Sequence, residues 1–253
     1  MMKKILAKFY FKIIGKTATQ SNGIKLRYLF QKDRKSQDLL VIFSAFPRTG
    51  MSATYNYVNT LKEVPGNKLF ILDDFGFQKR GVYYLCEQGS FQIRDAVEEL
   101  ITKIMQDVGA KQTTYIGSSK GGYAALYFGF RLNATNVISG APQYFVGEYL
   151  RAEPTRMPTL TSMLGEISEA KVQQLNNMLK EVISNQKAPT IHLHYSNKEH
   201  TYTSHIAPLL AKLADEQIRV EQDIKQYGSH AEVRHYFPPY LVQKLAQIRG
   251  ESL

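Results

Sequence analysis

Cysteine is almost absent from this sequence, since Cys86 is the single one in 253 residues. One cysteine cannot form an internal disulfide or a cysteine-based metal site, which favours a reducing compartment. No stretch approaches the 18 continuous apolar residues typical of a transmembrane helix. Zinc-finger spacings, RNP-like aromatic motifs and long Lys/Arg blocks are also missing, so nucleic acid is not an expected partner. No His/Asp cluster has metal-ligand spacing, and we expect neither metal nor cofactor.

What the chain does have is apolar bulk and positive charge. Hydrophobic residues make up 43%, with 16 Tyr and 13 Phe, which is typical of a globular protein. The length fits one large α/β domain or two small ones. The net charge of +10 predicts attraction to an anionic partner. Membrane headgroups and acidic polymers both satisfy that prediction, and charge alone does not choose between them.

The N-terminal segment, residues 1–16, carries lysines on one helical face and apolar residues largely opposite. Lys8 and Lys12 interrupt the apolar core that a secretory signal would need, and no small-x-small cleavage site follows. We therefore predict a basic amphipathic helix within residues 1–20. It either rests on an anionic membrane surface or packs against the domain with its lysines in water. The expected location is the cytoplasm or the inner face of the membrane.

The rest of the chain, residues 21–253, alternates apolar strands with helical segments, as in a mostly parallel sheet with helices on both faces. A long interval, about 143–188, interrupts the alternation, and we expect a small helical cap there. The predicted strands are 23–31, 39–44, 68–73, one from Thr113, 136–139, 189–195 and 218–223. The predicted helices are 91–108, 169–184, 205–215 and one starting near Pro238.

A strand, a glycine-rich corner and a helix meet at residues 117–121, where Gly-Ser-Ser-Lys-Gly fits G-x-S-x-G. In the α/β-hydrolase fold this turn holds the nucleophilic serine, here Ser119, at the carboxyl end of the sheet. The backbone N–H of Lys120 would be one oxyanion donor. We therefore predict an α/β-hydrolase fold for residues 21–253.

Two other interpretations of this corner stay open at this point. A strand, a glycine turn and a helix also describe a phosphate-binding loop, because helix N-termini attract anions. The segment matches neither G-x-x-x-x-G-K-[ST] nor G-x-G-x-x-G, and no acidic residue follows about 20 positions on. The other interpretation is a Gly/Ser loop without chemistry.

The loop after the strand 39–44 has the position of an oxyanion loop. The backbone N–H of Ala45 or Phe46 would complete the pair with Lys120. Arg48, in the same loop, either binds an anionic group of the substrate or is a solvated loop arginine.

The base of a hydrolase triad follows the last strand, and His230 lies there in Tyr-Gly-Ser-His-Ala-Glu. His235 is the reserve. His192 and His194 alternate within one strand, and we expect them to be structural.

The acid should follow the strand 189–195, where Glu199 is the one carboxylate. It would accept the Nδ1–H of His230 and stabilise the imidazolium. Glu199 could instead be a helix-start carboxylate favoured by the dipole. Asp74, after an earlier strand, is the alternative acid.

The segments GSSKGGYAALYFGFRL and ISGAPQYFVGEYL resemble α/β-hydrolase-like proteins of bacterial surface-glycan loci. These include capsular polysaccharide biosynthesis proteins and accessory secretion-system proteins that O-acetylate glycoproteins. The resemblance is strongest over residues 113–150, with weaker support from SNKEHTY and YGSHAE. It implies that Ser119, Glu199 and His230 form the triad of a glycan O-acyltransferase or esterase.

Three functions remain in competition. The first is serine-dependent acyl transfer on a bacterial surface glycan, through an acyl-Ser119 intermediate. The second is an ordinary carboxylesterase for a small ester. The third is a non-catalytic scaffold in polysaccharide biosynthesis or secretion that binds membrane through residues 1–16.

Overall fold

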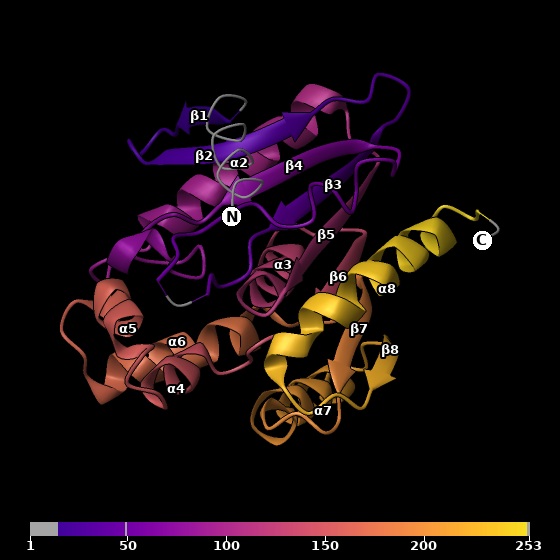
Figure 1. Cartoon of the computed structure of the whole chain (residues 1–253). Helices are drawn as coiled ribbons and strands as arrows, with labels where there is room; N and C mark the ends of the chain where they lie inside the picture. The colour runs from indigo at the N-terminus through magenta and orange to yellow at the C-terminus, as the bar shows by residue number, and fades with distance from the viewer. Residues whose placement is uncertain (1–14, 49, 252–253) are drawn as a thin grey trace.

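The fold is built on one eight-stranded sheet with the order β1-β2-β4-β3-β5-β6-β7-β8 (Figure 1). The computed structural model describes residues 15–48 and 50–251. From β4 across to β8 every neighbouring pair is parallel, whereas β1 and β2 are antiparallel to their neighbours. The strands are β1 (Lys16–Thr19), β2 (Lys25–Gln31), β3 (Asp38–Phe43), β4 (Asn67–Leu72), β5 (Gln112–Ser118), β6 (Asn136–Gly140), β7 (Thr190–Ser196) and β8 (Val220–Lys225).

Both faces of the central strands are covered. The longer helices are α2 (Gln92–Val108), α3 (Lys120–Arg131), α6 (Glu169–Val182), α7 (Ala207–Asp215) and α8 (Val233–Ile248). One core cluster joins α2, α3, α6 and α7 to one face, and a second joins α8 and residues 55–64 to the other. This double coverage explains why β3 and β4 are continuously apolar. The predicted mostly parallel sheet with helices on both faces is confirmed.

The interval 143–188 is helical, as predicted, with α4 (Val146–Arg151), α5 (Met157–Leu164) and α6. These three helices group together (Figure 1), and α6 packs against α3. Across residues 15–48 and 50–251, no helix is both long enough and apolar enough to span a membrane.

Two boundaries differ from the prediction. Residues 16–19 form β1, which pairs with β2 across a turn closed by the hydrogen bond from Gln20 N to Ile24 O, so the helix predicted within residues 1–20 does not include them. Residues 1–14 of that predicted helix lie outside the described residues. At the other end, α8 begins at Val233 and contains Pro238. Val233 and Phe237 are buried in the second core cluster, and this packing starts the helix before its prolines.

Glycines let the chain turn where β5 meets α3. A Cβ on Gly117 would lie 2.1 Å from the carbonyl oxygen of Gly121, and one on Gly121 would lie 2.5 Å from that of Phe43. Both obstacles are backbone atoms, so a side chain would push the helix away from the sheet.

We predict that Gly121→Ala lowers the free energy of unfolding by about 1–3 kcal/mol, because overpacking against fixed backbone forces a shift. Gly228→Ala is the matched control, since a Cβ there meets no described atom within 4 Å. Urea titration of both variants measures the difference. Equal midpoints for the two variants would contradict this account of the corner.

Candidate active site

Ser119 lies at the corner between β5 and α3 in a strained backbone conformation, with φ 53° and ψ −123°. Its backbone N–H donates to the carbonyl oxygen of Gly140 at 2.7 Å, which anchors the corner to β6. A positive φ in a residue other than glycine costs free energy, and such strain is concentrated at functional sites. The turn leaves Ser119 partly exposed at the carboxyl edge of the sheet.

His230 reaches this serine from the loop after β8. It begins a 3-10 turn, His230–Glu232, that Ser229 and Glu232 close with a capping box. The imidazole Nε2 lies 2.8 Å from Ser119 Oγ. The sequence predicted this residue as the base but placed it in a loop.

Glu199 follows β7, and its side chain is almost fully buried. Its Oε1 lies 2.5 Å from His230 Nδ1 and 2.5 Å from Thr201 Oγ1. Burial raises the pKa of Glu199, but the hydrogen bond and charge of His230, with the Thr201 hydrogen bond, outweigh it and lower the pKa. An ionised Glu199 holds the proton on Nδ1, so Nε2 is free to accept from Ser119.

The other candidate residues lie elsewhere. Asp74, the alternative acid, pairs with Arg27 at 3.2 Å. His235, the reserve base, accepts a hydrogen bond from Arg234 on the exposed side of α8. His192 and His194 contact Glu221 and Asp223 on β8 and are buried in the sheet, which agrees with a structural role.

Of the two backbone donors predicted in the loop 45–48, one already has a hydrogen-bond partner. The N–H of Ala45 donates to Asn56 Oδ1 at 2.8 Å and is therefore occupied. The N–H groups of Phe46 and Lys120 have no hydrogen-bond partner among the described residues. Phe46 and Lys120 are therefore the available pair of donors, and Asn56 is a site residue that sequence reasoning missed.

Lys120, the residue after Ser119, also takes part in a buried ion pair. Its Nζ lies 2.6 Å from Asp73 Oδ2, and both side chains are fully inaccessible to solvent. Burial lowers the pKa of Lys120, while the Asp73 charge opposes that shift. The same carboxylate accepts the N–H groups of Val82 and Tyr84. A Cβ on Gly81 would lie 2.4 Å from Nζ, so the loop can close over the pair only with glycine.

Tyr84 connects this ion pair to the oxyanion loop. Its hydroxyl donates to the carbonyl oxygen of Ile71 at 2.8 Å and accepts the N–H of Ser44 at 2.6 Å. Lys120 Nζ lies 4.7 Å from the centre of the Tyr84 ring. One network thus holds both the first residue of α3 and the residue before the loop 45–48.

A cleft of about 840 Å³ opens over Ser119 and His230. Its walls come from the loop 45–48, the segment 51–60 and the first part of α8. Arg48 and Arg234 are the arginines that line it, and none of the described lining residues is acidic. None of them belongs to 143–188 either, so the predicted cap does not line this cleft.

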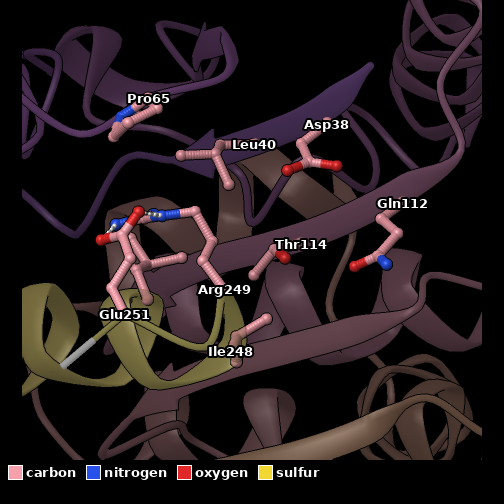
Figure 2. Close-up of a pocket in the computed structure, with 9 residues that line it drawn as sticks. Asp38, Leu40, Pro65, Gln112, Thr114, Ile248, Arg249 and Glu251 are labelled. Atoms are coloured by element: carbon pink, nitrogen blue, oxygen red, sulfur yellow. Dashed lines mark hydrogen bonds and ion pairs between the residues drawn. The ribbon is translucent and has the colours of Figure 1, made fainter. Parts of the chain in front are cut away.

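A second hollow, of about 360 Å³, lies at the opposite edge of the sheet (Figure 2). Asp38 and Gln112, which begin β3 and β5, line it. Figure 2 shows Arg249 and Glu251 paired beside it, with Nε 2.8 Å from Oε1. Ligands of open α/β sheets bind at the carboxyl ends of the strands, which favours the cleft over Ser119 as the active site.

No group of three or more His, Cys, Asp or Glu in the described part of the chain is arranged to hold a metal ion.

No protein-family model matches the chain, and no curated protein sequence matches it. Solved structures do match. The capsule O-acetyltransferase of Neisseria meningitidis serogroup A is 20% identical with a TM-score of 0.72, over 92% of this chain and 98% of that one.

Two further structures widen the comparison. The Gap123 glycosylation-associated protein complex of Streptococcus agalactiae is 19% identical with a TM-score of 0.73, over 92% of this chain and 46% of that one. The fluorophosphonate-binding serine hydrolase F of Staphylococcus aureus is 12% identical with a TM-score of 0.65, over 92% and 97%. At these identities the likeness shows the fold. The chain therefore has the α/β-hydrolase fold, and the resemblance predicted from its sequence is confirmed at that level.

We predict that Lys120→Met destabilises the protein by about 3–5 kcal/mol, because Asp73 is left charged and unpaired in the core. The double variant Lys120→Met/Asp73→Asn should recover part of that loss, since no buried charge remains. Chemical denaturation of both variants measures the difference. A double variant no more stable than Lys120→Met would contradict the charge explanation.

Proposed function

We propose that this protein is a serine-dependent acyltransferase or esterase that acts on a bacterial surface glycan. The observation that carries the proposal is the continuous hydrogen-bond chain from Ser119 Oγ through His230 to Glu199. It starts at a strained serine, and the N–H groups of Phe46 and Lys120 have no hydrogen-bond partner in the part of the chain that the structure describes. A structural serine needs neither the strain nor the imidazole.

In the first half-reaction His230 Nε2 takes the proton of Ser119 as Oγ attacks the carbonyl carbon of the acyl donor. The N–H groups of Phe46 and Lys120 would stabilise the oxyanion of the tetrahedral intermediate. His230 then gives the proton to the leaving group, and acyl-Ser119 remains. Glu199 stabilises the imidazolium throughout.

In the second half-reaction a hydroxyl group attacks the acyl-enzyme. His230 takes its proton and returns it to Ser119 Oγ as the ester bond breaks. A sugar hydroxyl as acceptor makes the reaction a transfer, and water makes it a hydrolysis.

The choice of a glycan rests on similarity and charge. The Neisseria meningitidis neighbour is a capsule O-acetyltransferase, and one of its structures is a complex with CoA. The cleft here has Arg48 and Arg234 and no acidic lining residue, which suits a substrate with anionic groups. An acyl donor that bears phosphates or an anionic glycan acceptor would meet the same two arginines.

Membrane association is a separate part of the proposal. The lysines of residues 1–16 would attract an anionic surface, which would hold the enzyme at the inner face of the membrane. In the scaffold alternative the protein binds the membrane in the same way but catalyses no reaction.

We predict that a fluorophosphonate probe adds once to the wild type and not to Ser119→Ala, because only an activated serine reacts. Intact mass spectrometry of both proteins measures the adduct. A single adduct lost in the variant establishes the nucleophile. No adduct on folded wild type would leave the scaffold alternative as the better account. Faster turnover of a p-nitrophenyl ester than of a glycan acceptor would favour the small-ester carboxylesterase.

We predict that Arg48→Glu and Arg234→Glu each raise KM for an anionic substrate about tenfold, because each reverses a charge beside the cleft. Hydrolysis of neutral p-nitrophenyl acetate should change little. Arg34→Glu is the matched control, since it makes the same charge change at an exposed position in the turn before β3. The measurement is KM for each variant as a function of salt concentration. An unchanged KM in both cleft variants would contradict the proposal that the substrate is anionic.

A further inference from the structure

Gln143 lies against the reacting atoms, although nothing in the sequence pattern marked it. It follows β6 in the loop 141–143 and is 1% exposed. Its Nε2 lies 3.1 Å from Ser119 Oγ and 3.4 Å from His230 Nε2. Ser119 Oγ therefore donates to His230 Nε2 at 2.8 Å and accepts from Gln143 Nε2, while Gln143 Oε1 lies farther from it, at 3.5 Å.

A buried tyrosine sets the orientation of this amide. Tyr83 is fully buried, and its hydroxyl lies 3.3 Å from Gln143 Oε1. Burial raises the pKa of Tyr83 well above its usual value, so the phenol keeps its proton and donates it. With its oxygen held by Tyr83, the amide must point its N–H groups toward Ser119 and Ala141.

The Gln143 orientation depends on the network around Lys120 and Asp73. Tyr83 stands between Val82 and Tyr84, whose N–H groups both bond to Asp73. It has a positive φ of 58°, which those two bonds help to hold. The carboxylate that pairs with Lys120 therefore also fixes the tyrosine that orients Gln143.

We propose that Gln143 is a further catalytic residue, whose side-chain N–H stabilises Ser119 Oγ while that oxygen carries negative charge. The inference rests on the proposed serine chemistry. A hydrogen bond to an ionised acceptor is stronger than one to a neutral hydroxyl, so the contact strengthens as charge develops.

The Gln143 hydrogen bond would act in two steps, the formation and the breaking of the bond between Ser119 Oγ and the acyl carbon. When Ser119 attacks, its proton goes to His230 Nε2 and an Oγ electron pair forms the bond to the acyl carbon. When the acyl-enzyme is resolved, the C–Oγ bond breaks, its electron pair returns to Oγ, and His230 gives back a proton. Gln143 donates to Oγ in both steps without exchanging a proton.

The position of Gln143 separates this role from that of the oxyanion donors. Phe46 lines the cleft that admits the substrate, whereas Gln143 is not among the lining residues. Its N–H is directed at the Ser119–His230 hydrogen bond from the buried side. It therefore acts on the nucleophile oxygen and not on the substrate carbonyl.

The test is the second-order rate of fluorophosphonate labelling at Ser119, followed by intact mass. Gln143→Met keeps the size of the side chain and removes the donor. We expect labelling about tenfold to a hundredfold slower, with an unchanged thermal midpoint. Gln243→Met is the matched control on the exposed side of α8 and should label like the wild type. A Gln143→Met rate within about twofold of wild type overturns the proposal.

Gln143→Glu is the second variant and decides the matter if Gln143→Met does not fold. It keeps an acceptor for Tyr83 but places a carboxylate beside His230. We expect slower labelling and a pH–rate midpoint moved to higher pH, because the new charge stabilises the imidazolium. A wild-type rate with an unmoved midpoint overturns the proposal.

The fluorophosphonate probe reacts with Ser119 without any substrate. The test therefore separates failure of the proposed serine chemistry from failure of the proposed role of Gln143. An unlabelled wild type overturns both the serine chemistry and the role of Gln143. A labelled wild type with equally fast Gln143 variants overturns the role of Gln143 alone.

Discussion

The buried ion pair between Lys120 and Asp73 is the interaction on which the site depends. Two desolvated charges are costly unless each is fully paired, and here Asp73 is also held by the N–H groups of Val82 and Tyr84. The pair lies under the first turn of α3, whose first residue, Lys120, follows Ser119. Tyr84, whose N–H is bonded to Asp73, contacts Ser44, the residue before the oxyanion loop. The neighbouring Tyr83 contacts Gln143. One buried network thus connects Lys120, the residue before the loop 45–48 and Gln143.

The network matters because the site is assembled from the ends of separate strands. Ser119 follows β5, Glu199 follows β7 and His230 follows β8, and parallel strands bring their carboxyl ends to one edge. The sheet alone does not set hydrogen-bond distances. Local devices do that: the strained corner at Ser119, the capping box around His230 and the Thr201 hydrogen bond to Glu199. The same edge carries the cleft with its two arginines.

The parts that the sequence predicted well are those that follow from order along the chain. G-x-S-x-G marks Ser119, and the rule of serine, then acid, then histidine selects Glu199 and His230, which the structure brings together. Gln143 and Asn56 have no such rule, because their roles depend on which atoms lie opposite them in space. The sequence could not choose between Ala45 and Phe46 for the same reason. The Ala45 N–H is bonded to Asn56, a residue from the next segment.

By itself the sequence determined the alternation of strands and helices, the corner that holds Ser119 and the candidate triad. These follow from local periodicity, glycine geometry and chain order, which act within short stretches. The tertiary structure decided that Lys120 pairs with Asp73, that α8 starts before its prolines and that the interval 143–188 does not line the cleft over Ser119. Those outcomes depend on burial and on contacts between residues distant in the chain. A local sequence pattern does not determine the free energy of such contacts.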